Sequence, residues 1–339
     1  MAKFVFRRFL WMFLVLFLVS IITFGLMHAV PGGPFSREKP LPAATVALLN
    51  AKYHLDEPLH IQYLYYITDI IVPRVTLERT PPSQSENYLI DIDLPDIFGD
   101  EARFKWVNFG PTYGSRSRSV NDIFRENLPV SIQLGIAALS LSLAIGLPLG
   151  VFTALKRNTF WDYGGMSVAI IGVSVPVIIS APLLQYLFGV QWRLFPVTGW
   201  GTPANVVLPA FALGFVNAAL IARLTRASLL QVLNEDFIRT ARAKGLAERR
   251  VISLHALKNS LIPVVTVIGP LAAALLTGTF VVETVFGIPG MGRYFISSIR
   301  ARDYPVIMGT VLLYAAVLVM ANLIVDLLYA WIDPRIRLE

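Results

Sequence analysis

Six apolar stretches, each about as long as a membrane-spanning helix, constrain the fold of this chain more than any other feature. They are Phe9–Val30, Val130–Leu155, Tyr163–Phe188, Val206–Leu224, Ile262–Val282 and Pro305–Trp331. A helix needs about 20 apolar residues to cross the hydrocarbon core of a bilayer, and lipid offers an open backbone no hydrogen-bond partners. The pattern therefore predicts an all-α polytopic membrane protein with six transmembrane helices, kinked at Pro148 and Pro176.

The composition also indicates lipid rather than water as the solvent. Of the 339 residues, 55% are hydrophobic and 15% are charged, whereas about a quarter of a soluble domain is charged. The formal charge of +7 does not indicate nucleic-acid binding, because the basic residues lie beside the apolar stretches rather than in one patch. The chain has no cysteine and only four scattered histidines, so we expect neither disulfides nor a metal site.

The Lys and Arg residues of the short connections predict that both termini are cytoplasmic. In that orientation the inside segments hold Lys3, Arg7, Arg8, Lys156, Arg157, the eight basic residues from Arg223 to Lys258, Arg335 and Arg337. The short outside connections hold Arg193, Arg293, Arg300 and Arg302. The first stretch exceeds the roughly 7–15 apolar residues of a signal peptide and is followed by no small-residue cleavage site, so we expect a retained first helix.

In this orientation residues 31–128 form a large external loop after the first helix. Leu55–Tyr66 is expected to be an amphipathic helix that starts at Asp-Glu-Pro. Val120–Asn127 is expected to be a short helix that leads into the second span. Val72–Lys105 is polar and has alternating apolar residues near Ile90, which is typical of either a short strand or an irregular segment.

The segment Asp236–Pro263 is predicted to be cytoplasmic and to break into two helical pieces about Gly245, since glycine permits a sharp turn. The first piece is expected to have Phe237, Ile238 and Ala241 on one side and arginines on another, and the second is expected to pack through Val251, Ile252 and Leu254. A short helix presented in this way fits a groove on a cytoplasmic partner, with its arginines reaching carboxylates there. The positive-inside rule accounts for the basic residues equally well, so the residues alone leave both interpretations open.

The same segment resembles the coupling loop of ABC-importer permeases, in which Glu-Ala-Ala-x-x-x-Gly forms the helix that docks into the nucleotide-binding subunit. Ala241 and Gly245 match this consensus, whereas Arg239 and Thr240 replace the Glu and the first Ala, and Lys258 stands at the position of a consensus proline. The dipeptide, oligopeptide and nickel permease family is more similar, because it reads Tyr-x-Arg-Thr-Ala-Arg-Ala-Lys-Gly-Leu. The matching residues are Arg239, Thr240, Ala241, Arg242, Ala243, Lys244, Gly245 and Leu246, with Phe237 in place of the Tyr.

Further motifs extend this resemblance along nearly the whole chain. They are Arg7-Arg8, Pro31-Gly32-Gly33-Pro34 (Gly33 for the usual Asp), Leu55-Asp56-Glu57-Pro58, Gln62-Tyr63, Asn127-Leu128-Pro129, Gly146–Gly150, Ala222–Arg226, Val282-Glu283, Phe286–Gly292, Arg302–Pro305 and Asp333-Pro334-Arg335. Permeases of this family come as a pair of subunits, and one of the two has a long first external loop. The chain is thus similar to that subunit. Val72–Lys105 has no counterpart in this pattern and is expected to be an insertion.

The resemblance implies an organisation and a set of partners. Residues 1–30 would hold a cytoplasmic stub and the first transmembrane helix, 31–128 an external loop with the insertion 72–105, and 129–339 a permease core of five helices with a coupling loop at 225–261. The chain would be a non-enzymatic subunit of a bacterial or archaeal cytoplasmic (inner) membrane, forming half of a translocation path for di- or oligopeptides. Its partners would be a second homologous permease subunit, two cytoplasmic ABC ATPases and an external solute-binding protein. No cofactor is expected in this chain; ATP and Mg²⁺ would bind the ATPases, because the sequence has no Walker motif.

Two groups of polar residues near the ends of the apolar stretches complete the predictions. A candidate external gate comprises Glu283, Gly290, Arg302 and Asp303, with Glu283 expected to pair with Arg293 or Arg302; an ion pair without gating is an equal alternative. Asp326 shares a helix face with Asn322 and is expected to pair with Arg335, since charges near helix ends reach the interface at low cost.

Alternative functions stay open at this point. Relatives of the same kind carry nickel, glutathione or oligosaccharides. An ion-coupled secondary transporter should show paired carboxylates in mid-membrane and inverted repeats, and a membrane enzyme should show catalytic pairs within the spans. None of these patterns is visible in the sequence.

Overall fold

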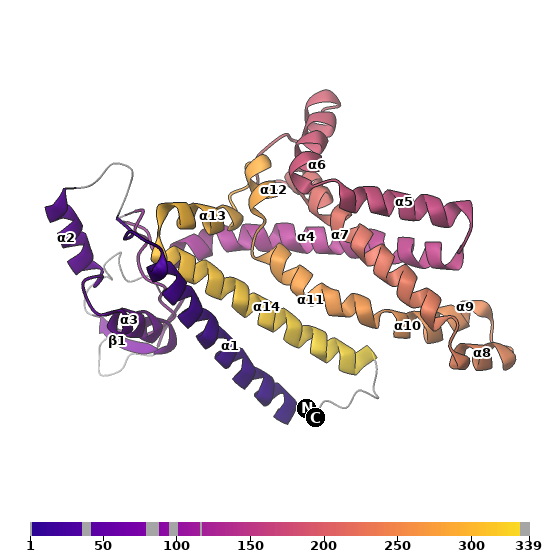
Figure 1. Ribbon diagram of the computed structural model, residues 1–339, viewed down its shortest axis with the longest axis horizontal. Helices are drawn as coiled ribbons and strands as arrows, with labels where there is room; N and C mark the ends of the chain where they lie inside the picture. The colour runs from indigo at the N-terminus through magenta and orange to yellow at the C-terminus, as the bar shows by residue number, and fades with distance from the viewer. Residues whose placement is uncertain (1, 36–41, 79–87, 95–100, 116, 333–339) are drawn as a thin grey trace. The chain divides into compact units, whose positions relative to one another are not determined.

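The computed structural model describes residues 2–35, 42–78, 88–94, 101–115 and 117–332, and the chain divides into two compact units. The first, called the core unit here, comprises residues 1–11, 130–292 and 316–339; the second, the loop unit, comprises residues 12–129 and 293–315. Figure 1 labels most of the elements of both units. The helices α1 (Ala2–Ala29), α4 (Val120–Leu155) and α14 (Tyr304–Ile332) each contribute residues to both.

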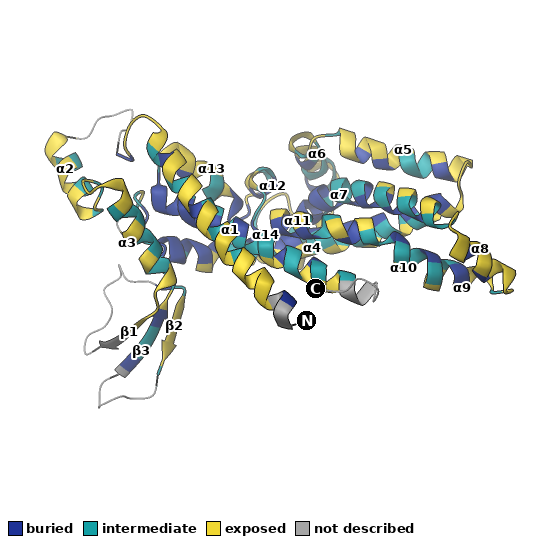
Figure 2. Ribbon diagram, turned by 60° about the horizontal axis from the view of Figure 1, so that its bottom comes forward, coloured by how far each residue is buried: buried dark blue, intermediate teal, exposed yellow. Residues whose placement is uncertain are grey.

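Five helical stretches in the described part of the chain are long and apolar enough to cross a membrane, or six if one bent pair counts as a single span. They are α1, α4, α7 (Pro203–Val232), α11 (Ile262–Leu276) together with α12 (Phe280–Val285), and α14. In the most apolar part of α1 only 6% of residues are buried, against 50% in α7, and the exposed face of α1 is evident in Figure 2. The chain is therefore a mostly helical, polytopic membrane protein, in which α7 lies at the centre of the core unit.

Small residues let α4 and α7 approach each other closely within the core unit. A Cβ atom added at Gly146 would lie 2.6 Å from the carbonyl oxygen of Ala218. The hydroxyl of Ser142 donates a hydrogen bond of 3.0 Å to the carbonyl oxygen of Gly214. Such close contacts join helices in lipid, where burial of apolar surface alone gives little preference for a neighbouring helix.

The third apolar stretch, for which a span kinked at Pro176 was expected, is bent more sharply than a kink. It forms α5 (Phe160–Ser174), α6 (Val177–Leu184) and the π-helical turn η1 (Gln185–Gln191), and the chain bends by 102° between α5 and α6. Pro176 lies at the bend, and Val175 before it is extended, with φ −89° and ψ 114°. The residue before a proline is disfavoured in the helical region, so the predicted kink becomes a break.

The fifth stretch is interrupted as well, because α11 ends at Leu276 and α12 begins at Phe280. Between α7 and α11 the core unit has four short helical elements: α8 (Asp236–Ala243), α9 (Glu248–Arg250), the π-helical turn η2 (Val251–Ala256) and α10 (Leu257–Ser260). The break about Gly245 is therefore confirmed.

The loop unit is not all-α. Besides α2 (Ala43–Lys52), α3 (Leu59–Ile71) and α13 (Gly292–Ala301), it holds β1 (Arg74–Glu78), β2 (Ile90–Asp93) and β3 (Glu101–Trp106), which form an antiparallel sheet in the order β1-β3-β2. The strand interpretation near Ile90 is thus confirmed. The indole nitrogen of Trp106 donates to the carbonyl oxygen of Ile71 at 3.0 Å, which joins the sheet to α3.

Two helix boundaries in the loop unit differ from the prediction. The helix α3 begins at Leu59 rather than Leu55 and runs to Ile71. The preceding Pro58 is extended, with ψ 142°, and it restricts Glu57 to non-helical conformations. The short helix expected at Val120–Asn127 is the first part of the continuous helix α4.

Asp326 has an ion-pair partner that the sequence did not predict. Its carboxylate lies 2.7 Å from the guanidinium of Arg8 on α1, whereas Arg335 lies outside the described residues. Both charged groups belong to the core unit, so α1 and α14 are joined there by an ion pair.

A bidentate ion pair joins α5 to α7. The guanidinium of Arg226 donates from Nε and Nη2 to the two carboxylate oxygens of Asp162, both at 2.7 Å. The backbone N–H of Asn158 donates to the same carboxylate at 3.0 Å. The Asp162 side chain is 1% exposed and that of Arg226 is 26% exposed, so the carboxylate depends on these donors in place of water.

We expect Asp162→Asn to lower the free energy of unfolding by about 2 kcal/mol, because it leaves a partly buried guanidinium without its anion. Thermal unfolding of the detergent-solubilised protein measures the loss. Asp236→Asn is the matched control: its ion pair with Arg239 is exposed, so the change should be below about 0.5 kcal/mol. Strict additivity in the double variant with Arg226→Gln would contradict a direct interaction.

Candidate functional site

The short helix α8 is held against the core unit by two of its residues. Ile238 is completely buried and Ala241 nearly so. They belong to one apolar cluster with Ala154 of α4, Leu229 of α7 and Val251 of η2. A displacement of α8 therefore acts directly on the ends of α4 and α7.

Leu254 was expected to pack and does not, and Phe237 is exposed although it was expected on the same side of the helix as Ile238 and Ala241. Phe237 is 43% exposed and Leu254 is 63% exposed. Ile238 and Ala241 are three apart and face the core, whereas Phe237, four residues before Ala241, lies at the edge of the same face of α8. In the π-helical turn η2 the hydrogen bonds run to the fifth residue, so Val251 and Ala256 face the core there and Leu254 does not.

Gly245 ends α8 in a Schellman motif. Its N–H donates to the carbonyl of Arg242 at 2.9 Å, and the N–H of Leu246 donates to the carbonyl of Ala241 at 3.4 Å. Gly245 has φ +75°, which glycine adopts without the steric cost of a Cβ atom. A Cβ added there would meet nothing within 4 Å, so the backbone conformation, rather than space, requires glycine.

An ion pair spans the turn after α8. Arg242 donates from Nε and Nη2 to the two carboxylate oxygens of Glu248, at 3.1 and 2.7 Å. Hydrogen bonding to Arg242 lowers the pKa of Glu248, and the same bond raises the pKa of Arg242. Because the folded pKa of Glu248 is lowered, the pair stabilises the turn above the ordinary carboxyl pKa and is lost as the pH falls through the folded value.

The remaining predicted residues form an exposed basic face. Arg239, Thr240, Arg242, Ala243, Lys244 and Gly245 are exposed, and Leu246 is half-buried. The structure thus brings the predicted coupling residues together on one short helix and its cap, with Ala241 directed to the core. Arg249 and Arg250 of α9 are exposed as well, which extends the basic surface.

We expect substitutions at Gly245 to loosen the end of α8 in a graded way. Gly245→Asn should cost less than Gly245→Ala, because Asn tolerates the left-handed region better; the Ala variant should cost about 1 kcal/mol. Hydrogen exchange of the α8 and Leu246 amides measures the effect. Gly164→Ala is the control, since Gly164 has an ordinary φ and open space around it; equal exchange in all variants would contradict the motif's role.

Glu283 is the centre of a second, buried site in the core unit. Its side chain is 1% exposed. One carboxylate oxygen accepts hydrogen bonds from the Ser131 hydroxyl (2.8 Å) and the Thr279 N–H (3.1 Å), and the other accepts from the Gly292 N–H (2.7 Å). The Ser131 hydroxyl in turn accepts from the N–H of Met291 at 2.8 Å. The carboxylate therefore organises the backbone on both sides of α12.

Gly290 packs directly against this carboxylate. A Cβ atom at position 290 would lie 2.5 Å from the carboxyl carbon of Glu283 and 2.6 Å from the Ser131 oxygen. Only glycine fits at that contact. The structure thus confirms that Glu283 and Gly290 lie together, while their role in a gate stays a prediction.

The other two gate candidates belong to the loop unit. Asp303 is 4% exposed, and one of its oxygens accepts hydrogen bonds from the Thr112 hydroxyl and from the Gly114 N–H, the latter at 3.1 Å. Arg302 donates to the carbonyl oxygen of Pro31 at 2.9 Å. The predicted gate therefore divides into two clusters, one in each unit.

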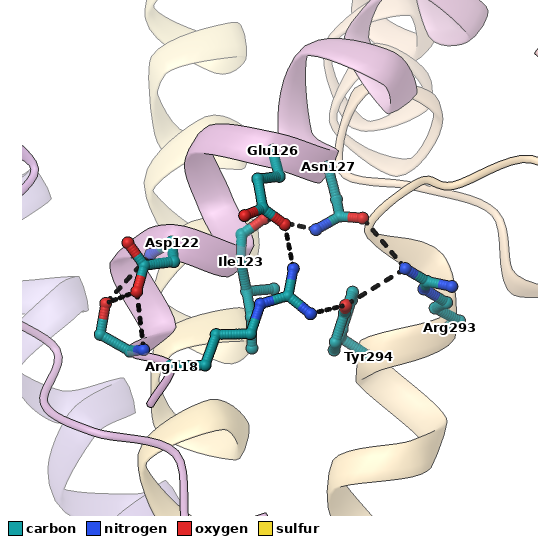
Figure 3. A network of polar contacts seen from close by, with 8 residues as sticks. Arg118, Asp122, Ile123, Glu126, Asn127, Arg293 and Tyr294 are labelled. Atoms are coloured by element: carbon teal, nitrogen blue, oxygen red, sulfur yellow. Dashed lines mark hydrogen bonds and ion pairs between the residues drawn. The ribbon is translucent and has the colours of Figure 1, made fainter. Parts of the chain in front are cut away.

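Arg293, which was expected to pair with Glu283, takes part in a polar network at the start of α4 and α13 (Figure 3). It donates to the side-chain oxygen of Asn127 and to the hydroxyl of Tyr294, each at 3.2 Å. Arg118 donates to the same hydroxyl at 3.2 Å and forms an ion pair with Glu126. The network joins α13 to the first turns of α4.

We expect Glu283→Ala to destabilise the protein by about 2–4 kcal/mol, because it leaves buried N–H groups without an acceptor. Glu283→Gln should cost less, since its oxygen can keep part of these bonds. Thermal unfolding in detergent measures both. The exposed Glu235 gives the control, and Glu235→Ala should stay within about 0.5 kcal/mol. An equal effect of the Ala substitutions at 283 and 235 would contradict the buried hydrogen-bond network.

The sequence interpretation missed several partners in these sites: Ser131, Thr112, Asp162, Arg226 and Arg8. Asp162 and Arg226 carried a usable signal, because an ionisable residue near the end of an apolar stretch is expensive without a partner. Ser131 and Thr112 carried none, since hydroxyl residues are frequent in and beside membrane helices.

Comparison with known proteins identifies the family. Residues 146–338 match the model described as "Binding-protein-dependent transport system inner membrane component", and residues 1–84 match the model of the corresponding N-terminal part. The chain belongs to this family. It is a membrane-embedded permease component of a binding-protein-dependent transport system, and its relatives are transport subunits rather than enzymes.

The curated relatives span the whole chain. The dipeptide transport system permease protein DppB of Bacillus subtilis (strain 168) is 43% identical over 339 residues, covering 100% of this chain and 99% of the relative. The oligopeptide transport system permease proteins OppB of Escherichia coli (strain K12) and Haemophilus influenzae are 39% and 37% identical, covering 99% of this chain and 100% of each relative. These alignments run over nearly the whole length of both chains, and the insertion expected at Val72–Lys105 stays a prediction.

Two solved structures of the inward-facing MetNI methionine ABC transporter share the fold. They give TM-scores of 0.52 and 0.50 at 19% identity, covering 62% of this chain and 96% of the other chain. At this identity the likeness concerns the fold, which is that of an ABC-transporter permease.

Proposed function

We propose that this chain is one of two similar permease subunits of an ATP-driven importer for di- or oligopeptides in the cytoplasmic (inner) membrane of a bacterium or archaeon. The relatives with the highest identities quoted above are named for dipeptide and oligopeptide transport, which supports the substrate class. A second homologous permease would supply the other half of the translocation path. An external solute-binding protein would deliver the peptide, and two cytoplasmic ATPases would bind ATP and Mg²⁺.

The proposed topology has six spans, with α5 and the α6–η1 segment counted as one. Both termini and the α8–α10 segment are cytoplasmic, and residues 31–128 are external. The distribution of Lys and Arg over the short connections supports this orientation.

The observation that carries the proposal is the two-sided arrangement of α8. Ile238 and Ala241 contact the ends of α4 and α7 on one side, and Arg239, Arg242 and Lys244 are exposed on the other. A short, basic, exposed helix suits an acidic groove on a partner protein. When the ATPases close on ATP, their movement of α8 reaches α4 and α7 through the buried pair, and the path changes its access from one side to the other.

We expect Arg239→Glu to lower peptide-stimulated ATPase activity at least tenfold, because a like-charge contact at the docking surface costs more than about 1.4 kcal/mol. The complex, reconstituted in liposomes with its ATPases and binding protein, gives the rate. Gly245→Pro should abolish coupling, since proline cannot adopt φ +75°.

Lys156→Glu is the matched control for the charge reversal. Lys156 is exposed at the end of α4 on the same proposed side of the membrane, but it lies outside the α8 segment. Full coupling in Arg239→Glu, or an equal loss in Lys156→Glu, would rule out docking at α8. Stimulation by nickel, glutathione or oligosaccharide but not by peptide would overturn the substrate class and leave the docking proposal intact.

A further inference from the structure

The loop unit contains a cavity of about 210 Å³ lined by residues of α1, α2, α3 and the start of α14. Its wall includes the aromatic residues Phe24, Tyr53, Tyr66, Phe109, Tyr113 and Tyr304. Aromatic rings present a negative face, which attracts a cation placed against it. The coupling and gate residues discussed above do not line this cavity.

His28, which lines the cavity, presents a hydrogen-bond acceptor. Its Nδ1 lies 2.8 Å from the carbonyl oxygen of Phe24, and a carbonyl oxygen only accepts. In the neutral ring the hydrogen is therefore on Nδ1, and Nε2 carries a lone pair. Nε2 is buried, and the described residues offer it no hydrogen-bond partner.

Further polar groups are the Tyr66 hydroxyl and the Asp69 carboxylate, which line the cavity, and the Asp303 carboxylate, which lies near its wall. The Tyr66 hydroxyl is buried and, within the described parts of the chain, has no hydrogen-bond partner. Asp69 lines the cavity and pairs with Arg74. Asp303 lies close enough to Tyr113 that its charge, added to the larger effect of burial, raises the pKa of the Tyr113 hydroxyl. An unpaired acceptor, a free hydroxyl and nearby carboxylates favour a ligand that is positively charged and donates several hydrogen bonds, as a primary ammonium group does.

An apolar groove of about 570 Å³ adjoins the cavity between α1 and α3. It shares Phe24 and His28 with the cavity and is also lined by Ile21, Gly25, Leu59 and Tyr63. Because α1 is an apolar span, this groove follows the surface that faces lipid. At the cavity rim the exposed Lys52 ammonium lies 5.3 Å from the centre of the Tyr53 ring, where it can attract an anion.

We propose that the cavity and the groove together bind an aminophospholipid, with the primary ammonium of an ethanolamine headgroup in the cavity and an acyl chain in the groove. Lys52 would contact the phosphate between them. A peptide amino terminus carries the same ammonium group, but it supplies neither the phosphate nor the hydrocarbon chain that these features fit. The proposal requires only that α1 spans the membrane and does not depend on the transported substrate.

The test is lipid binding to the full chain, purified in detergent with its partner subunits and titrated with phosphatidylethanolamine, phosphatidylcholine and phosphatidylglycerol of identical acyl chains. Native mass spectrometry resolves the bound lipids. The ethanolamine lipid should bind about tenfold more tightly than the choline lipid, because a trimethylammonium group has no N–H to donate. Tyr66→Phe should remove most of this preference, and loss of an unpaired buried hydroxyl should not destabilise the fold.

Two further variants distinguish the binding of the lipid headgroup from the binding of the acyl chain. Tyr63→Phe is the matched control on the same helix: the Tyr63 hydroxyl already bonds Ser20 at 2.7 Å, so headgroup preference should be unchanged. Gly25→Leu should weaken the binding of all three lipids alike, because the leucine side chain fills the groove. Its Cβ meets nothing within 4 Å, so the substitution fits the fold.

Three results would overturn the proposal. They are equal binding of the three lipids by the wild-type chain, an unchanged preference in Tyr66→Phe, and displacement of the ethanolamine lipid by a dipeptide at lower concentration than by free lipid. The last result would assign the cavity to a peptide amino terminus. The wild-type headgroup series needs no substitution, so it decides the question even if a variant unfolds.

Discussion

Close packing between α4 and α7 is the contact on which the rest of the core unit depends. Lipid competes with a neighbouring helix for apolar surface, so helices in a membrane need small residues and internal hydrogen bonds to prefer each other. Gly146 lets α4 approach the backbone of α7 at Ala218, and Ser142 bonds the backbone at Gly214. The other elements then pack on α7, with α5 held by the Asp162–Arg226 pair and α8 by the cluster at Ile238 and Ala241.

Buried carboxylates give the structure its fixed points near the ends of the apolar stretches. Asp162 uses a guanidinium, Glu283 uses two N–H groups and a hydroxyl, and Asp303 uses a hydroxyl and an N–H. Charge-assisted donors replace the water of these carboxylates, except at Asp303 Oδ1, which is buried and has no hydrogen-bond partner among the described residues. In contrast, the pairs of α8 and its turn, Arg239–Asp236 and Arg242–Glu248, are exposed. That difference suits the two roles: the carboxylates near the spans hold backbone in place, and the α8 segment presents charge to a partner.

The sequence predicted those parts of the fold that depend on neighbouring residues better than those that depend on residues far apart in the sequence. Apolar length alone found the stretches that form long apolar helices in the described part of the chain, because the bilayer thickness sets that length. The 102° bend at Pro176 was visible only as a kink, since a proline breaks the local hydrogen bond but neighbouring elements set the angle. The sheet of the loop unit was predicted only at Ile90, because its other strands pair across long separations in sequence. In the α8 segment Gly245 was predictable, whereas the exposure of Leu254 followed from a π-helical turn that the sequence does not signal.

The sequence by itself determined the membrane class, the number of apolar stretches, the basic character of the α8 segment and the family resemblance. These properties can be read from the composition and from the order of residues within short segments of the chain. Only the tertiary structure decided which polar groups meet: Glu283 with Ser131 and Gly292, Asp326 with Arg8, and the tyrosines and His28 around one cavity. The physical reason is that a buried polar group must find its partner in space, and for these groups the partner comes from another element of the fold.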